Sequence, residues 1–211
     1  MSKSASGNFF EDFTVGQVIH HATPRTVTAG DVALYTALYG PRFAVQSSTA
    51  FARAVGYPAA PIDDLLVFHI VFGKTVPDIS LNAVANLGYA ECRFLRAVYP
   101  GDTLYTVTEV IGRKENSNGK TGTVYVRSRG FNQNDEEVLS FVRWVMLRKR
   151  DETAAAPAAV VPQLAAAVDP AQLGAACPVI AGDRWNTAPA GSPHRFSDYA
   201  VGEKIDHLDG M

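Results

Sequence analysis

One stretch of the sequence decides the fold: Ile62-Asp-Asp-Leu-Leu-Val-Phe-His-Ile-Val-Phe-Gly-Lys-Thr-Val76. On a helix drawn over this stretch, large apolar residues fall on every side instead of forming one stripe. We therefore expect a helix that is buried nearly all round. Asp63 and Asp64 fall in its first turn, where the helix dipole favours carboxylates.

The residues after this helix alternate between apolar and polar and predict four long strands, at about 82–98, 102–114, 120–132 and 137–149. Turn-forming residues separate them, in Pro100-Gly101-Asp102, Asn116-Ser-Asn-Gly119 and Asn132-Gln-Asn-Asp135. Long strands joined by short turns form a curved antiparallel sheet. The simplest way to bury the helix is to wrap it in this sheet, which is the α+β hotdog fold.

Shorter elements precede the central helix. Thr28 is placed to cap a helix at about 29–39, which ends at Gly40-Pro41. A second short helix is predicted from Ser48 to about Val55, before Gly56. A strand is expected around 17–21, after the turn at Val15-Gly16.

The composition changes near residue 151 and divides the chain. Between 151 and 190, 14 of 40 residues are alanine and 5 are proline, so this segment cannot build a core of its own. We interpret 1–150 as one compact domain and 151–190 as a linker lying over it. The apolar residues of this linker are expected to dock on the domain: Val160, Val161, Leu164, Val179, Ile180 and Trp185.

A repeat begins after the linker. Residues 10–21 align with residues 196–207, and 6 of the 12 positions are identical. We interpret 191–211 as the start of a second domain of the same kind, truncated in this chain.

Composition and charge also exclude several classes of function. The formal net charge is −2, so no global basic field exists to hold a nucleic acid or an anionic membrane. The longest strongly apolar run, Leu65 to Phe72, is too short to span a bilayer, and Met1 to Phe13 contains no signal peptide. Cys92 and Cys177 suggest no disulfide framework, and we expect a cytoplasmic protein without a metal site.

Several motifs give the chain a family resemblance. It resembles the MaoC-like hotdog hydratases that act on acyl-CoA thioesters, and within them the members that hydrate mesaconyl-CoA to β-methylmalyl-CoA. The resemblance rests on Asn8-Phe-Phe-Glu-Asp-Phe13, His21-Ala-Thr-Pro-Arg-Thr26, Gly30-Asp-Val-Ala-Leu-Tyr35, the run from Ala60 to Ser80, Val98-Tyr-Pro-Gly-Asp-Thr-Leu104 and Gly119-Lys-Thr-Gly-Thr-Val-Tyr125.

The resemblance implies reversible hydration of an enoyl-CoA without a cofactor, coenzyme A being part of the substrate. In the family, an Asp or Asn and a His five positions later hold the attacking water, and backbone N–H groups at the start of the buried helix stabilise the enolate. It also implies a double hotdog. The expected partners are therefore the acyl-CoA substrate and a second hotdog, in the same chain or in a homo-oligomer.

This chain departs from the family pattern at both sites. Pro41 and Gln46 stand where the acid/base pair belongs, and neither side chain transfers a proton at neutral pH. Asp63 and Asp64 replace the family's His-Gly at the helix start, where carboxylates oppose a developing oxyanion. We therefore expect the chain to be the non-catalytic N-terminal half, inactive alone, with the catalytic pair beyond Met211.

Other residues remain as weaker candidates. Asp63, Asp64 and His69 are weak catalytic candidates, each with a structural alternative as a helix cap or a core histidine. His20 and His21 point to opposite sides of a strand, so a structural role is expected for them. The candidates for binding coenzyme A or the distal carboxylate are the basic residues Arg25, Arg42, Arg93 and Arg96.

Two alternative functions stay open. The same fold supports acyl-CoA thioesterases, which need a carboxylate near the helix start, and Asp63 or Asp64 meets that need. A non-catalytic module that binds acyl thioesters or only dimerises is the other alternative.

Overall fold

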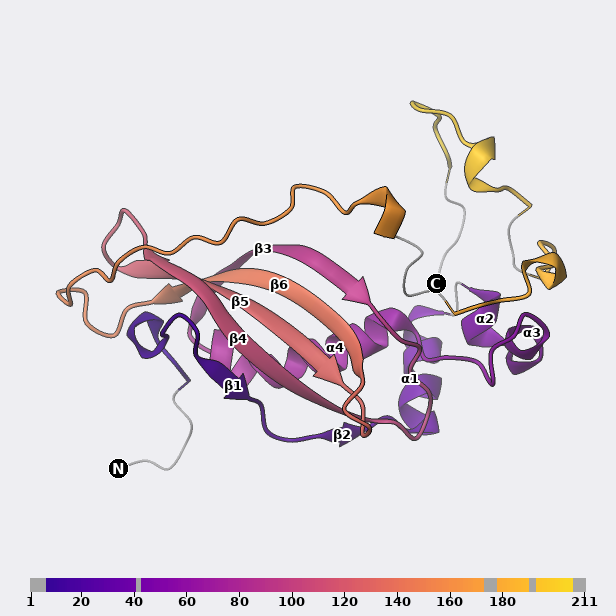
Figure 1. Cartoon of the computed structure of the whole chain (residues 1–211), viewed down its shortest axis with the longest axis horizontal. Coiled ribbons are helices and arrows are strands. Elements are labelled where there is room, and N and C mark those ends of the chain that lie inside the picture. Colours follow the sequence, from indigo (N-terminus) through magenta and orange to yellow (C-terminus); the bar gives the residue numbers. More distant parts are fainter. Residues whose placement is uncertain (1–6, 41–42, 173–177, 190–192, 207–211) are drawn as a thin grey trace. The chain divides into compact units, whose positions relative to one another are not determined.

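The computed structural model describes residues 7–40, 43–172, 178–189 and 193–206 (Figure 1). The chain divides into two compact units. The first combines residues 1–26, 67–96 and 103–177, and the second combines 27–66, 97–102 and 178–211. The domain boundaries expected at 150 and 190 stay a prediction.

An antiparallel sheet dominates the first unit, in the order β1-β4-β5-β6-β3, with β2 also pairing with β4. The four long strands confirm the sequence prediction, because the turns between them lie where the turn residues stand. The bounds are β1 Val18–His20, β2 Arg25–Thr26, β3 Ala83–Phe94, β4 Thr103–Glu115, β5 Thr121–Phe131 and β6 Glu137–Arg148.

The central helix, α4 (Asp64–Thr75), runs along one face of this sheet and continues into a π-helical turn at Val76–Ser80 (Figure 1). Phe68 and Phe72 of α4 contact Phe141 of β6 with ring centroids 5.1 and 6.5 Å apart. The Val71 side chain fills the space above Gly130, where a Cβ would lie 2.5 Å from it. A sheet that curves around a central helix is the predicted hotdog arrangement.

The burial of α4 differs from the prediction. Leu66, Val67, Ile70 and Val71 are buried, but Leu65, His69 and Gly73 are exposed. The last three are spaced four residues apart and lie on one side of the helix. The expectation of a helix buried all round was therefore wrong for this chain, because an apolar sequence does not say whether the covering surface belongs to the same domain.

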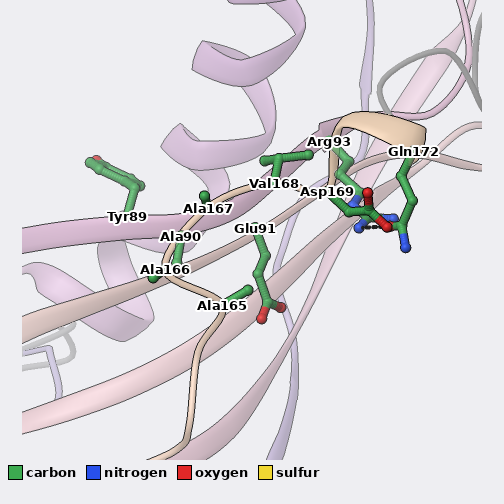
Figure 2. Close-up of a pocket in the computed structure, with 10 residues that line it drawn as sticks. All are labelled: Tyr89, Ala90, Glu91, Arg93, Ala165, Ala166, Ala167, Val168, Asp169 and Gln172. Carbon is green, nitrogen blue, oxygen red and sulfur yellow. Dashed lines mark hydrogen bonds between the residues drawn. The ribbon is translucent and has the colours of Figure 1, made fainter.

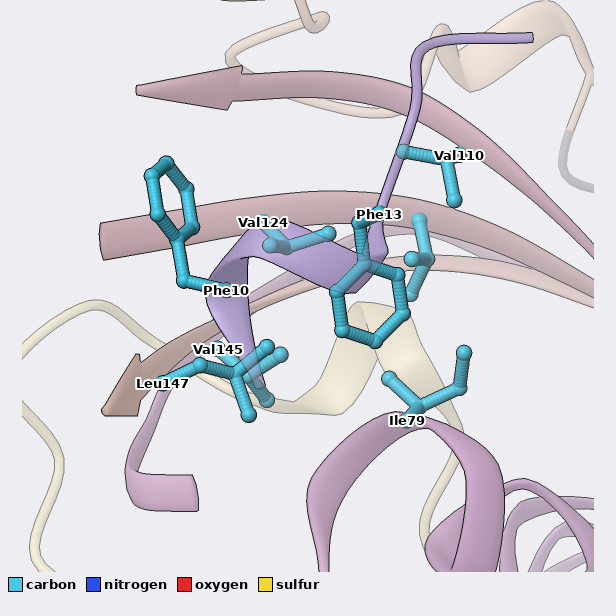
Figure 3. Packing of buried hydrophobic residues seen from close by; sticks show 8 residues of the cluster. Phe10, Phe13, Ile79, Val110, Val124, Val145 and Leu147 are labelled. Atoms are coloured by element: carbon cyan, nitrogen blue, oxygen red, sulfur yellow. The ribbon is translucent and has the colours of Figure 1, made fainter. Parts of the chain in front are cut away.

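The N-terminal segment closes one end of the core. A short 3-10 helix, η1 (Phe10–Asp12), places Phe10 and Phe13 among side chains of the sheet and the π-helical turn (Figure 3). The ring of Phe10 lies over Gly122 of β5, where any Cβ would overlap it. The other members of this core are Ile79, Val110, Val124, Val126, Val145 and Leu147.

The second unit contains short helices. The Thr28 hydroxyl accepts the N–H of Asp31 and caps α1 (Ala29–Tyr39), as predicted. The predicted second helix is two helices, α2 (Ala44–Ser47) and α3 (Thr49–Ala54), because Ser48 adopts an extended backbone and caps α3 through the N–H of Phe51. A small core of Val45, Ala52 and Val55 holds this part together.

The alanine- and proline-rich segment lies on the sheet of the first unit as far as residue 172. The N–H of Val160 donates to the carbonyl of Arg113 at 2.9 Å, and Gly112 leaves room for Val160 and Pro162. Within the second unit, Trp185 packs edge-on against Phe51 at 5.1 Å. Val160 thus contacts the sheet through its backbone and Trp185 contacts Phe51 through its ring, while the side chains of both residues, like those of Val161, Val179 and Ile180, stay partly or largely exposed.

Candidate functional site

The positions of the family's acid/base pair fall in the second unit. Pro41 and Arg42 lie outside the described residues. Gln46 belongs to α2, and its Oε1 atom is buried with no hydrogen-bond donor among the described residues. A buried acceptor of this kind has lost its hydration without gaining a partner, which is unfavourable. An amide has no proton to exchange at neutral pH, so Gln46 offers binding and not acid/base chemistry.

Asp63 and Asp64 stand at the start of α4. The Oδ1 atom of Asp63 accepts the backbone N–H of Leu65 at 2.8 Å, which is a capping interaction. Desolvation, and then the negative charge of Asp63, raise the pKa of the Asp64 carboxyl above its usual range. The two carboxyl groups stand at the start of α4, where the family resemblance implied stabilisation of an enolate oxygen.

His69 lies on the exposed side of α4, with its ring 6.2 Å from that of Phe68. The expected alternative of a core histidine is wrong, because the residue lies on the uncovered side of the helix.

The basic candidates do not converge on one point. Arg25 is exposed on the short strand β2. Arg93 donates a hydrogen bond to the side-chain amide of Gln172, while Arg96 forms an exposed ion pair with Glu136 at 3.3 Å. An exposed pair of this kind contributes little stability.

Arg93 lines a pocket between β3 and the linker segment, with a volume of about 340 Å³ (Figure 2). Three consecutive alanines, Ala165 to Ala167, form part of the linker side of the pocket, and their small side chains let the peptide chain come close to the strand. The lining residues are Tyr89, Ala90, Glu91, Arg93, Ala165, Ala166, Ala167, Val168, Asp169 and Gln172.

Glu91 stands out in this pocket, because its φ of 52° is unusual for a residue other than glycine. It lies where the register of β3 against β6 shifts, at a bulge between Ala90 and Arg93. Its carboxylate pairs with Arg127 of β5 at 2.6 Å, and the hydrogen bond from Arg127 lowers the pKa of Glu91. The bulge thus turns an acidic side chain toward β5.

A second cavity of about 390 Å³ shares Glu91 and Arg93 with this pocket. It brings together Arg93, Arg127 and Arg129, a grouping that includes one of the sequence-predicted binding residues. Glu91 and Glu137 line it as well, so its charge is largely balanced. Arg127 and Arg129 are two positions apart on β5 and therefore lie on the same face of the strand.

A buried polar cluster, formed around His21, lies on the inner side of the sheet. His21 Nδ1 is 2.7 Å from Asp78 Oδ2, and His21 Nε2 is 2.7 Å from Thr108 Oγ1. Thr108 Oγ1 is in turn 2.8 Å from Ser128 Oγ. Burial is the main cause that lowers the pKa of His21. The arrangement resembles a proton relay, but it ends at the buried hydroxyls of Thr108 and Ser128, and the structural role expected for His21 stays a prediction.

Arg143 of β6 is the largest fully buried side chain in the described part of the chain. Its guanidinium donates to the hydroxyls of Thr75 at 2.8 Å and Ser80 at 3.3 Å, and lies 4.5 Å above the ring of Phe72. Burial lowers the pKa of the Arg143 guanidinium from its ordinary value to about 10. Nothing local in the sequence marks a strand arginine as a core residue, so the burial of Arg143 could not be predicted.

Comparison with known proteins identifies the family. Residues 2–178 match the family model described as mesaconyl-CoA hydratase. The chain belongs to the mesaconyl-CoA hydratase family. Its β-methylmalyl-CoA dehydratase relative from Chloroflexus aurantiacus is 62% identical over 210 residues, which are 100% of this chain and 59% of the relative.

Solved structures place the family within the hotdog proteins. A structure described as a MaoC domain protein dehydratase from Chloroflexus aurantiacus has a TM-score of 0.91 and 60% identity, and the match covers 99% of this chain and 59% of that one. A Mycobacterium tuberculosis protein described as a double hotdog has a TM-score of 0.64 and 30% identity, covering 86% and 55% of the two chains. The fold prediction is thereby confirmed.

This member of the mesaconyl-CoA hydratase family spans about 60% of the length of the curated relatives it matches. Among the described residues, no three His, Cys, Asp or Glu side chains gather as they would around a metal ion. No helix in that part of the chain is both long enough and apolar enough to span a membrane.

Proposed function

We propose that this chain is the non-catalytic N-terminal half of an enzyme that reversibly hydrates mesaconyl-CoA to β-methylmalyl-CoA. The observation that carries the proposal is the family match over residues 2–178, together with relatives named for both directions of this reaction. These relatives are longer than this chain, which leaves room for a catalytic half.

The side chains at the two family sites support a non-catalytic role. Gln46 cannot activate water, and Asp63 and Asp64 place negative charge at the start of α4. An enolate oxygen that forms next to these carboxylates gains no stabilisation from them. Proton transfer and oxyanion binding are therefore assigned to the second half.

The N-terminal half contributes a surface for that second half. β3 is the last strand of the sheet, and among the described residues it pairs with a strand only on its β6 side. Val84, Leu87 and Tyr89 on this strand are exposed large side chains. An apolar edge strand favours pairing with another sheet, so we assign β3 to contact with a second hotdog, in the same chain or in an oligomer.

We also propose that the reaction needs no cofactor or metal, because coenzyme A arrives with the substrate and water addition is an acid–base reaction. A cytoplasmic location belongs to the same proposal, since Cys92 is a free thiol. The test uses an enzyme that contains both halves. Hydratase activity that survives dialysis against a chelator supports this point, and activity that returns only with an added metal contradicts it.

The test compares two proteins. The 211-residue chain alone is expected to show no hydration of mesaconyl-CoA. A chimera that continues this chain at Met211 with the remainder of the Chloroflexus aurantiacus relative is expected to be active, as monitored by loss of the enoyl-thioester absorbance. Activity in the short chain contradicts the non-catalytic role, and a folded but inactive chimera contradicts the hydratase proposal.

Asp64 favours one second candidate, an acyl-CoA thioesterase. A raised carboxyl pKa makes Asp64 a stronger base, which suits activation of a hydrolytic water. Release of free coenzyme A by the 211-residue chain, abolished in Asp64→Asn but kept in Asp63→Asn, would transfer the assignment to hydrolysis. Absence of release in the unchanged chain removes this candidate.

A further inference from the structure

The repeated segments share their local structure, hydrogen bond for hydrogen bond. We call residues 9–17 the first copy and 195–203 the second copy. In each copy, the N–H of the first residue donates to the carboxylate of the aspartate three positions later, at 2.9 Å in the first copy and 2.7 Å in the second. A 3-10 turn follows in both, at Phe10–Asp12 and Phe196–Asp198.

The match continues to the end of each copy. Gly16 and Gly202 both have a φ of 85°. The side chains of Gln17 and Glu203 each accept the backbone N–H three positions earlier, at 3.0 Å in both copies. A turn this similar is not explained by chance similarity of a few residues, so the second copy is a real structural repeat of the first.

Burial separates the two copies. Phe10 is 1% exposed and Phe13 is 0% exposed, because both are packed in the core of the sheet (Figure 3). At the equivalent positions, Phe196 is 97% exposed and Tyr199 is 49% exposed. We call the two aromatic side chains of a copy its anchor, which is Phe10 with Phe13 in the first copy and Phe196 with Tyr199 in the second. The second copy therefore has the local structure of the first, but its anchor is not packed in a core.

The first copy shows what such a surface must contain. The ring of Phe10 fits because Gly122 of β5 has no side chain, and a Cβ there would overlap the ring. Val110, Val124 and Leu147 of the sheet belong to the same core cluster, together with Ile79 of the π-helical turn. The receptor for this anchor thus combines a strand glycine with branched apolar side chains of the sheet and of the turn after the central helix.

We propose that Phe196 and Tyr199 anchor the second copy in the sheet of a second hotdog, on a strand that carries a glycine at the position equivalent to Gly122. The site on the first sheet is already filled by Phe10 of the same chain. Another copy of this chain has the same site filled in the same way, so it offers no vacant receptor. The relatives, of which this chain spans about 60%, have length for a further sheet.

This inference deepens the proposed function, since it specifies how the second hotdog is attached, and the experiment reads stability instead of turnover. Thermal unfolding is measured for the 211-residue chain and for the chimera described above. Phe196→Ala is expected to lower the chimera's melting temperature by about 10 °C, the effect typical of a lost core phenylalanine. The same change is expected to leave the melting temperature of the short chain unaltered.

Phe10→Ala is the matched control, because it removes an equivalent ring from an occupied site and lowers the melting temperature of both proteins. Phe196→Leu keeps part of the apolar volume, and its effect on the chimera is expected to be smaller than that of Phe196→Ala. An unchanged chimera melting temperature in Phe196→Ala overturns the inference, as does a shift of the short chain to lower temperature. A chimera that is inactive yet destabilised by Phe196→Ala contradicts the hydratase proposal and leaves this inference standing.

Discussion

His21 Nδ1 lies 2.7 Å from a carboxylate oxygen of Asp78, and this contact ties the end of the N-terminal segment to the π-helical turn after α4. On the other side of the ring, the Thr108 hydroxyl reaches Nε2 from β4. A neutral ring that donates from Nδ1 and accepts at Nε2 satisfies all three groups. His21 therefore connects three segments far apart in the sequence, and its protonation state matters for their stability.

Stability is expected to fall in acid because of this histidine. The pKa of His21 is lower in the folded chain than its ordinary value of 6.5, so the unfolded chain binds the proton more tightly. The stabilisation by the neutral ring is complete above about pH 6.5 and is lost as the pH falls through the lower folded pKa. Urea unfolding between pH 7.5 and 5 is expected to show a shallower pH dependence in His21→Gln than in the unchanged chain.

His20 provides the control for this measurement, since it is the neighbouring residue of β1 and is exposed. His20→Gln is expected to keep the slope of the unchanged chain. Equal slopes for His21→Gln and the unchanged chain would show that the ring of His21 does not couple folding to pH.

Gly122 is expected to tolerate no side chain. A Cβ at this position would overlap the ring of the buried Phe10 side chain, so Gly122→Ala forces Phe10 and η1 to shift. Overpacking of this kind costs about 1–3 kcal/mol of unfolding free energy. Denaturant titration measures the loss.

Gly73→Ala is the opposite case in the same protein. Gly73 is an exposed helical glycine, and an added methyl group would have nothing within 4 Å, so alanine is expected to stabilise α4 by up to about 1 kcal/mol. If Gly122→Ala and Gly73→Ala changed the unfolding free energy in the same direction, overlap with the Phe10 ring would not explain the effect of Gly122→Ala.

Arg143 is expected to contribute to the free energy of unfolding mainly through the space that its side chain fills, and less through its charge. A fall of its pKa from the ordinary arginine value to about 10 corresponds to a cost of about 3 kcal/mol for the charged form. Arg143→Met keeps much of the packing and removes that cost, so we expect a loss of at most about 1 kcal/mol. Arg143→Ala leaves a cavity beneath Phe72 and is expected to cost about 3–5 kcal/mol.

The two Arg143 variants are compared by urea unfolding under the same conditions. A methionine variant as unstable as the alanine variant would show instead that the hydrogen bonds to Thr75 and Ser80 dominate.

The sequence was sufficient to predict the sheet and the central helix, because alternation and turn residues act locally. Asn118 is an example: its side chain accepts two backbone N–H groups within the turn that joins β4 and β5. The bulge at Glu91 could not be predicted, since its backbone depends on the pairing of β3 with β6 and on Arg127 of β5. The one-sided burial of α4 escaped prediction for a related reason, because apolar composition does not identify the covering surface.

At the candidate site, the sequence predicted only that the residues depart from the acid/base pattern of the family. Gln46 was recognised by its position, but its buried and unsatisfied amide oxygen appears only when α2 is folded. Arg127 and Arg129 share a face by alternation, whereas the approach of residues 165–172 to β3 carries no local signal. An alanine-rich segment contacts a sheet through its backbone, because its small side chains allow a close approach. Such a segment has no hydrophobic periodicity from which the contact could be predicted.

The linker segment is expected to depend on Gly112 of β4. A Cβ at Gly112 would lie 2.6 Å from the carbonyl oxygen of Val160 and 2.7 Å from Pro162 Cδ, so Gly112→Ala pushes this part of the linker away. The backbone hydrogen bond from Val160 to Arg113 would be lost with it. We expect faster hydrogen exchange at Val160 and faster proteolysis between 151 and 172, with little change in the exchange of β5 and β6.

Gly182→Ala is the matched control for this test, because Gly182 has nothing within 4 Å of an added Cβ and follows the docked segment. Its exchange and cleavage pattern should equal that of the unchanged chain. Protection of Val160 that persists in Gly112→Ala would mean that the linker is held mainly at its other contacts, at Lys149 with Ala154 and at Arg93 with Gln172. Release in Gly112→Ala would instead establish close backbone approach as the main attachment of the linker to the sheet.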